Sequence, residues 1–138
     1  MKTIALTTLV TALMLSSCQM DPGSEVYTNV VIPIDTRTVP ERGYVDVPLS
    51  IYAHAQLPNG CWSNIRFFFS EKEEYLYELF SLADFNSGTG ACPEVMVTAD
   101  TLLFFEPKAP GDYVIVTWMS TTSNELDTIK VEVITPEK

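Results

Sequence analysis

The sequence has little positive charge and only one histidine. Its 138 residues include 8 Lys and Arg against 18 Asp and Glu, giving a formal net charge of −10, and the single histidine is His54. Because phosphate groups are bound by clusters of Lys and Arg, we expect no nucleic-acid partner. A cationic partner is permitted, since opposite charges steer association.

Motifs of catalysis and cofactor binding are missing too. The sequence contains no Gly-x-Ser-x-Gly, phosphate-binding loop, dinucleotide fingerprint or His-Glu-x-x-His. His54 has no obvious nucleophile or metal partner, and the glutamates within 71–74 suit a solvated turn better than paired catalytic carboxylates. The pattern Asp84-x-Asn86-x-Gly88 resembles the start of a calcium-binding loop, but the third oxygen ligand and the final bidentate glutamate of such a loop are missing. We therefore expect the protein to be non-enzymatic and to bind no metal ion and no cofactor.

The apolar stretch at the N-terminus is too short to span a membrane. Lys2 provides a positive start, and apolar residues interrupted by threonines run from Ile4 to Leu15. A spanning helix needs about 20 mostly apolar residues, whereas this shorter pattern is typical of a secretory signal peptide. Residues 1–17 are predicted to direct export.

The end of this stretch, Leu15-Ser16-Ser17-Cys18, resembles a bacterial lipobox. The resemblance implies that the Cys18 thiol carries a diacylglyceryl group, that cleavage precedes it, and that fatty acid such as palmitate caps the new amino terminus. The alternative is an ordinary secretory signal cut before a cysteine. We predict a lipoprotein signal peptide over 1–17, a lipidated tether over 18–25 and a single domain over 26–138, attached to the membrane through its lipid.

With Cys18 lipidated, two cysteines remain in an exported chain. Exported proteins fold in oxidising compartments, where an even pair of thiols commonly forms a disulfide. Neither Cys61 nor Cys92 has a second Cys or His close to it in the sequence, which disfavours a metal site. We predict a Cys61–Cys92 disulfide.

Alternating hydrophobicity predicts an all-β domain. Apolar residues occupy the odd positions from Val45 to Ala53, and further strand patterns cover 62–69, 101–105, 113–118 and 127–134, with Pro- and Gly-rich turns between them. Segment 71–80 is ambiguous, because its apolar spacing fits either a helix or the second strand of a hairpin; its aromatic residues favour the hairpin. We expect an antiparallel β-sandwich of about seven or eight strands with one disulfide.

The last third of the chain resembles the final strands of bacterial immunoglobulin-like domains, such as those of the PKD family. The resemblance rests on Phe105-Glu106-Pro107, Pro110-Gly111-x-Tyr113, a strand bearing Trp118 and the closing strand 129–133. It implies an immunoglobulin-like sandwich with a corner tyrosine. Ile115 stands where antibody domains have a cysteine, so an antibody-type core disulfide is not expected.

The whole chain is similar to small lipoproteins of Bacteroidota. In that group a short Asp-Ser/Thr-apolar motif directs O-glycosylation, and this motif occurs at Asp100-Thr101-Leu102 and Asp127-Thr128-Ile129. Thr101 and Thr128 are thereby candidate O-glycosylation sites. Gln19 does not supply the aspartate that retains enterobacterial lipoproteins in the inner membrane, so we expect an outer-membrane location.

Four aromatic residues fall in the solvent-facing phase of their predicted strands: Tyr44, Tyr52, Trp62 and Phe68. Together they are a candidate face for binding a protein or glycan, unless another layer covers them. We expect a non-enzymatic, lipid-anchored envelope or cell-surface protein that acts by binding. The alternatives are an envelope inhibitor of a cationic hydrolase such as lysozyme, and a structural subunit of a surface complex.

Overall fold

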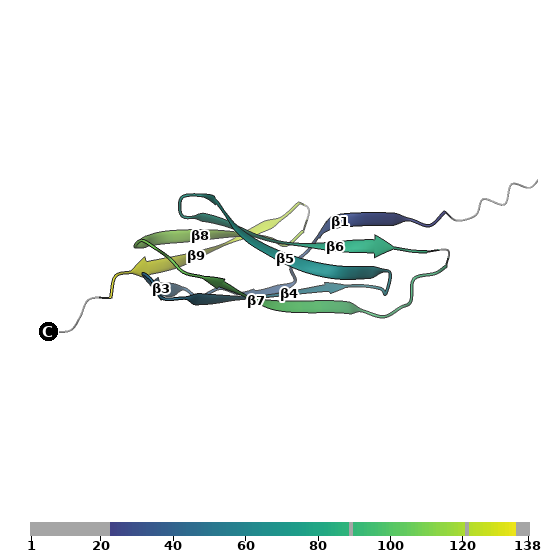
Figure 1. Ribbon diagram of the computed structural model, residues 1–138, viewed down its shortest axis with the longest axis horizontal. Helices are drawn as coiled ribbons and strands as arrows, with labels where there is room; N and C mark the ends of the chain where they lie inside the picture. The colour runs from purple at the N-terminus through teal and green to yellow at the C-terminus, as the bar shows by residue number, and fades with distance from the viewer. Residues whose placement is uncertain (1–22, 89, 121, 135–138) are drawn as a thin grey trace, which may run out of the picture.

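A computed structural model describes residues 23–88, 90–120 and 122–134, and this part of the chain contains nine strands and no helix (Figure 1). The strands are β1 (Val26–Ile32), β2 (Thr36–Thr38), β3 (Arg42–Tyr44), β4 (Leu49–Leu57), β5 (Trp62–Glu73), β6 (Leu76–Asn86), β7 (Val97–Phe105), β8 (Gly111–Trp118) and β9 (Asn124–Glu132). A membrane-crossing helix is therefore not found within these ranges. The predicted signal peptide and Cys18 lie outside the described residues.

Two sheets pack face to face as the predicted immunoglobulin-like β-sandwich. The six-stranded sheet has the path β1-β6-β8-β9-β3, with β5 on the other side of β6, and the three-stranded sheet has the order β2-β4-β7. There are more strands than expected because prolines divide the N-terminal third. Pro33, Pro40 and Pro48 follow β1, β2 and β3, and proline cannot donate a backbone hydrogen bond.

Strand β6 organises the larger sheet. β5 pairs along one of its edges, while β1 and β8 share the other: β1 pairs with residues 81–86 and β8 with residues 76–79. The β6–β8 and β3–β9 pairs are parallel, and the remaining pairs are antiparallel. The parallel pair places the start of β6 beside the second half of β8.

The core lies between the sheets and follows the predicted alternation. Ile51 and Ala53 of β4 face Leu79, Ile115 and Ile129 of the larger sheet, and all five are fully buried.

A corner tyrosine closes one end of this core. The Tyr113 hydroxyl donates to the Ala109 carbonyl at 2.9 Å and accepts the Ala109 N–H at 3.3 Å, which is the corner expected at the start of this strand in immunoglobulin-like domains. Ile115 fills the position of the absent cysteine.

The ambiguous segment 71–80 belongs to the β5–β6 hairpin, so the strand interpretation is confirmed. The strands are joined at Glu74 and Tyr75, and Tyr75 has the left-handed φ of 62°. The predicted disulfide is confirmed as well. Cys61 and Cys92 are bonded with their Cα atoms 5.2 Å apart, and the Asn86 N–H donates to the Cys61 carbonyl at 2.9 Å.

Candidate functional site

The four aromatic residues predicted as a binding face do not form one patch. Tyr44 is exposed on the edge strand β3 of the larger sheet. Tyr52 lies on the outer face of the smaller sheet, opposite Leu102. Trp62 and Phe68 share β5 but point to opposite faces of it. The structure therefore distributes these four residues over separate surfaces.

A β-bulge explains the position of Trp62. The register between β5 and β6 shifts between Ser63 and Arg66, and Asn64 within the bulge has a φ of 54°. A shift of one residue reverses the face on which the preceding side chains lie. The Trp62 ring packs against the interior cluster that includes Ala83, so the solvent-facing phase predicted from alternation is wrong for this residue.

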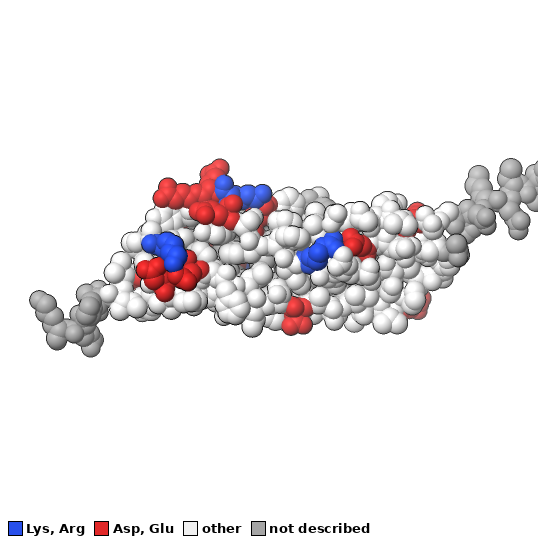
Figure 2. Space-filling model, in the orientation of Figure 1, with Lys and Arg blue, Asp and Glu red and all other residues white. Residues whose placement is uncertain are grey.

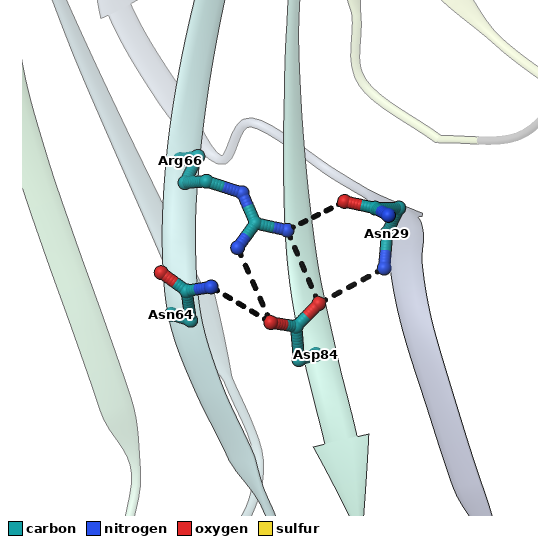
Figure 3. A network of polar contacts seen from close by, with 4 residues as sticks. All are labelled: Asn29, Asn64, Arg66 and Asp84. Carbon is teal, nitrogen blue, oxygen red and sulfur yellow. Dashed lines mark hydrogen bonds and ion pairs between the residues drawn. The ribbon is translucent and has the colours of Figure 1, made fainter.

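A polar network holds this bulge and a second one (Figure 3). The Asp84 carboxylate accepts hydrogen bonds from the Asn29 N–H at 2.9 Å, from Asn64 Nδ2 at 2.7 Å and from both terminal nitrogens of Arg66 at 3.1–3.2 Å. Asn29 lies in the bulge of β1 and has a φ of 55°. The Asn29 N–H and the Arg66 guanidinium lower the pKa of Asp84. The network thus joins β1, β5 and β6.

This network leaves no calcium loop at 84–88. Asp84 is occupied by Arg66 and the two asparagines, and the Asn86 Oδ1 accepts the Gly88 N–H at 2.8 Å in a local turn. Within the described residues no group of His, Cys, Asp and Glu is arranged to hold a metal ion.

The outer face of the six-stranded sheet carries an apolar surface with a hollow in it. The rings of Phe68 and Phe80 stack with their centroids 5.1 Å apart. Beside them lies a pocket of about 170 Å³, which we call the Trp118 pocket; it is lined by Val31, Lys72, Glu78, Phe80 and Trp118. Phe68, one of the four predicted aromatics, therefore borders a pocket through its stack with Phe80.

The polar groups of the Trp118 pocket contact one another. The indole Nε1 of Trp118 donates to Glu78 Oε1 at 2.7 Å, and Lys72 Nζ lies 2.6 Å from Glu78 Oε2. The Glu78 side chain is 15% exposed and that of Lys72 is 54% exposed. A half-buried carboxylate thus stands between an indole and an ammonium group, with an aromatic ring alongside.

The sheet topology assembles this pocket from distant parts of the chain. Parallel pairing of β6 with β8 matches Leu79 with Thr117, which brings Glu78 and Phe80 beside Trp118. β1 continues along the same edge of β6 and adds Val31. The one sequence signal was the alternation of Trp118 with the inward residues Ile115 and Thr117, which places the indole on the outer face.

A second hollow lies at the hairpin end of the sandwich, where acidic side chains gather (Figure 2). It also measures about 170 Å³, and its walls include Tyr75, Tyr77 and Tyr113 with the carboxylates of Glu71 and Glu74. Burial, followed by the charge of Glu71, raises the pKa of Tyr77. Lys108, paired with Glu106, also lines the hollow, so this end of the molecule combines aromatic walls with a rim of three carboxylates and one ammonium group.

The remaining predicted residues lie on strands. His54 is half-buried on the outer face of the smaller sheet, opposite Asp100. Thr128 is exposed on the outer face of the larger sheet, whereas Thr101 is partly buried and pairs with the fully buried Ala53 in the inward phase. Of the two candidate glycosylation sites, Thr128 is the accessible one.

Comparison with known proteins adds no family to these observations. No protein-family model matches the chain, and no curated protein or solved structure matches it either.

Proposed function

We propose that this chain is a non-catalytic, lipid-anchored protein of the outer membrane that binds a glycan in the Trp118 pocket. The observation that carries the proposal is the pairing of aromatic walls with a hydrogen-bonded carboxylate and a neighbouring ammonium group in one hollow. Binding sites for small polar ligands commonly combine apolar walls with a few placed polar groups.

A sugar ring has the chemistry that this arrangement complements. One face of a pyranose presents C–H groups, which pack on an aromatic ring, while its hydroxyls point outward around the rim. Phe80 and Trp118 supply the apolar platform, Glu78 has lone pairs to accept from hydroxyls, and Lys72 donates. At about 170 Å³ the pocket is below the roughly 300–1,000 Å³ of drug-sized sites, and so suits one ring of a glycan.

The location rests on the N-terminal sequence and is supported by the disulfide. The Cys61–Cys92 bond suits an oxidising compartment. The described chain begins beside β1, at the end of the sandwich opposite the β5–β6 turn (Figure 1). A lipid on Cys18 would hold that end at the membrane and leave the outer face of the larger sheet open to ligands. Mass spectrometry of membrane-extracted protein should find acyl chains on the N-terminal peptide, and a soluble, unmodified N-terminus would contradict the anchor.

A glycan array followed by calorimetry tests the binding proposal. We expect Trp118→Ala to weaken binding of the best glycan by about tenfold or more, because a central aromatic contact is lost. Leu126→Ala is the matched control, since Leu126 lies on the same sheet face, is 68% exposed and is outside the pocket. No binding to any glycan, or equal losses in both variants, would contradict the proposal.

The acidic hairpin end favours a second candidate function, inhibition of a cationic hydrolase. Glu71, Glu73 and Glu74 are exposed at the β5–β6 turn, where an acidic projection meets a basic cleft with favourable electrostatics. A lysozyme assay with added protein tests this candidate. Inhibition that is lost when all three glutamates become glutamine, but kept in Trp118→Ala, would support it; no inhibition at any ratio would remove it.

A further inference from the structure

We infer that β7 is a dimerisation edge, at which two copies of this chain pair antiparallel to join their three-stranded sheets. This interaction is independent of the proposed glycan pocket, which lies on the other sheet.

The first argument is the regularity of β7. It pairs with β4 over nine consecutive residues, from Leu49↔Phe105 to Leu57↔Val97, without a register shift. In the described part of the chain β4 is its only partner, so its other edge is open. Open edges are usually protected by bulges, prolines or charged side chains, above all Lys. β7 has no bulge, proline, Lys or Arg, and its single charged residue is Asp100, whereas β5, the other long edge strand, has two register shifts together with Arg66 and Lys72.

The second argument is the exposure of large apolar side chains on this strand. Leu102 is 56% exposed and Phe104 is 73% exposed, and Val95 and Met96 just before β7 are both 61% exposed. Tyr52 of β4 lies directly opposite Leu102 and extends the apolar strip inward. A strip of this kind beside an open edge is typical of a surface that another strand covers.

Charge favours a second copy as the occupant. Two molecules of net charge −10 repel each other, and the repulsion is smallest when they approach through surfaces that carry few charges. The outward residues of the smaller sheet carry one acidic group, Asp100, with His54 opposite it. These residues are Thr36, Thr38, Ser50, Tyr52, His54, Gln56, Thr98, Asp100, Leu102 and Phe104. An antiparallel β7 pair also satisfies both open edges at once, because each copy presents the same strand.

Sedimentation velocity of the Cys18→Ala chain, which has no thiol for lipid, tests the inference. We expect a dimer fraction that rises with protein concentration and with salt, because salt screens the residual repulsion. The double variant Leu102→Lys, Phe104→Lys should raise the dimer dissociation constant by about tenfold or more. Leu126→Lys, an equally exposed change on the other sheet, should leave it unchanged. A monomer at every concentration, or equal effects of both variants, would overturn the inference.

A cysteine scan keeps the test valid if the double variant folds poorly. The single variants Thr98→Cys, Asp100→Cys, Leu102→Cys and Phe104→Cys should form intermolecular disulfides most strongly near the two-fold axis and progressively less away from it. The Leu126→Cys variant should form none. Uniform cross-linking along β7, or cross-linking no stronger than at position 126, would also overturn the inference.

Discussion

The outer faces of the two sheets are both partly apolar, but they are built differently. On the six-stranded sheet, aromatic rings stack on each other and surround a hollow whose carboxylate is held by an indole and an ammonium group. On the three-stranded sheet, Leu102 and Phe104 stand exposed on a flat strand beside an open edge. A recessed site with fixed polar groups suits a small ligand, whereas a flat open edge suits another strand.

The two edges of the three-stranded sheet also differ. We call the side at β2 the closed side and the side at β7 the open side. On one side Arg37 of β2 crosses to the larger sheet, where it pairs with Asp127 at 2.6 Å and Glu125 at 2.7 Å on β9. On the other side β7 lies across from β5, and the disulfide joins the β4–β5 and β6–β7 connections at one end of the sandwich. Within the described residues, the β2 edge is thus tied to the larger sheet, whereas β7 pairs only with β4 and its other edge is open.

The largest expected effect comes from removing the disulfide on the open side. Cys61→Ala with Cys92→Ala should lower the free energy of unfolding by about 2–5 kcal/mol, because the unfolded chain gains freedom across this loop. Denaturant unfolding measures the loss, with the reduced native protein as a comparison. A loss below about 1 kcal/mol would show that the bond constrains little.

The two tryptophans should separate folding from binding. Trp62 packs on the interior cluster, so Trp62→Ala should cost about 2–4 kcal/mol of stability and leave glycan affinity unchanged. Trp118 lies on the outer face, so Trp118→Ala should cost roughly 1 kcal/mol or less while reducing affinity. Thermal unfolding and calorimetry on both variants provide the test, and the reverse pattern would exchange the two roles.

The ion pairs on the closed side should contribute less. The Arg37 side chain is 13% exposed, and Arg37→Met should cost about 1–2 kcal/mol, between the values for surface and buried pairs. Lys72→Met is the control, because Lys72 is 54% exposed in its pair with Glu78 and should cost about 0.5 kcal/mol or less. Equal losses in denaturant unfolding would argue against a special role for the β2–β9 contact.

The smallest effect concerns pH and Asp84. Because its pKa in the folded protein lies below the ordinary 3.8, Asp84 adds stability that is complete above pH 3.8 and is lost as the pH falls through the folded pKa. Between pH 6 and pH 2.5, the free energy of unfolding should fall less steeply with decreasing pH for Asp84→Asn than for the native protein. An equal dependence of the free energy of unfolding on pH in both proteins would show that protonation of Asp84 does not affect stability.

Local sequence patterns predicted much of the scaffold. Alternation identified β4 and β8, Pro-Gly turns marked their ends, and an even pair of thiols pointed to the disulfide. The bulge at Asn64 was not predicted, because Asp84 on the neighbouring strand holds it, and so Trp62 was assigned to the wrong face.

The Trp118 pocket was not predicted from the sequence, because it also depends on which strands become neighbours. Glu78 and Trp118 are 40 residues apart, and they meet only because β6 and β8 pair in parallel. Hydrophobic periodicity shows which face of a strand a residue occupies, but not which strands become neighbours.

The indole N–H signals in a ¹⁵N-correlated NMR spectrum test the glycan proposal most directly. The chain has two tryptophans, so Trp62 and Trp118 give two such signals, which the Trp62→Phe variant assigns. On titration with the best glycan from the array, the Trp118 signal should shift progressively, because its N–H bonds to Glu78 within the pocket. The Trp62 signal should stay in place. A bound glycan that moves the Trp62 signal, or neither signal, would contradict the account.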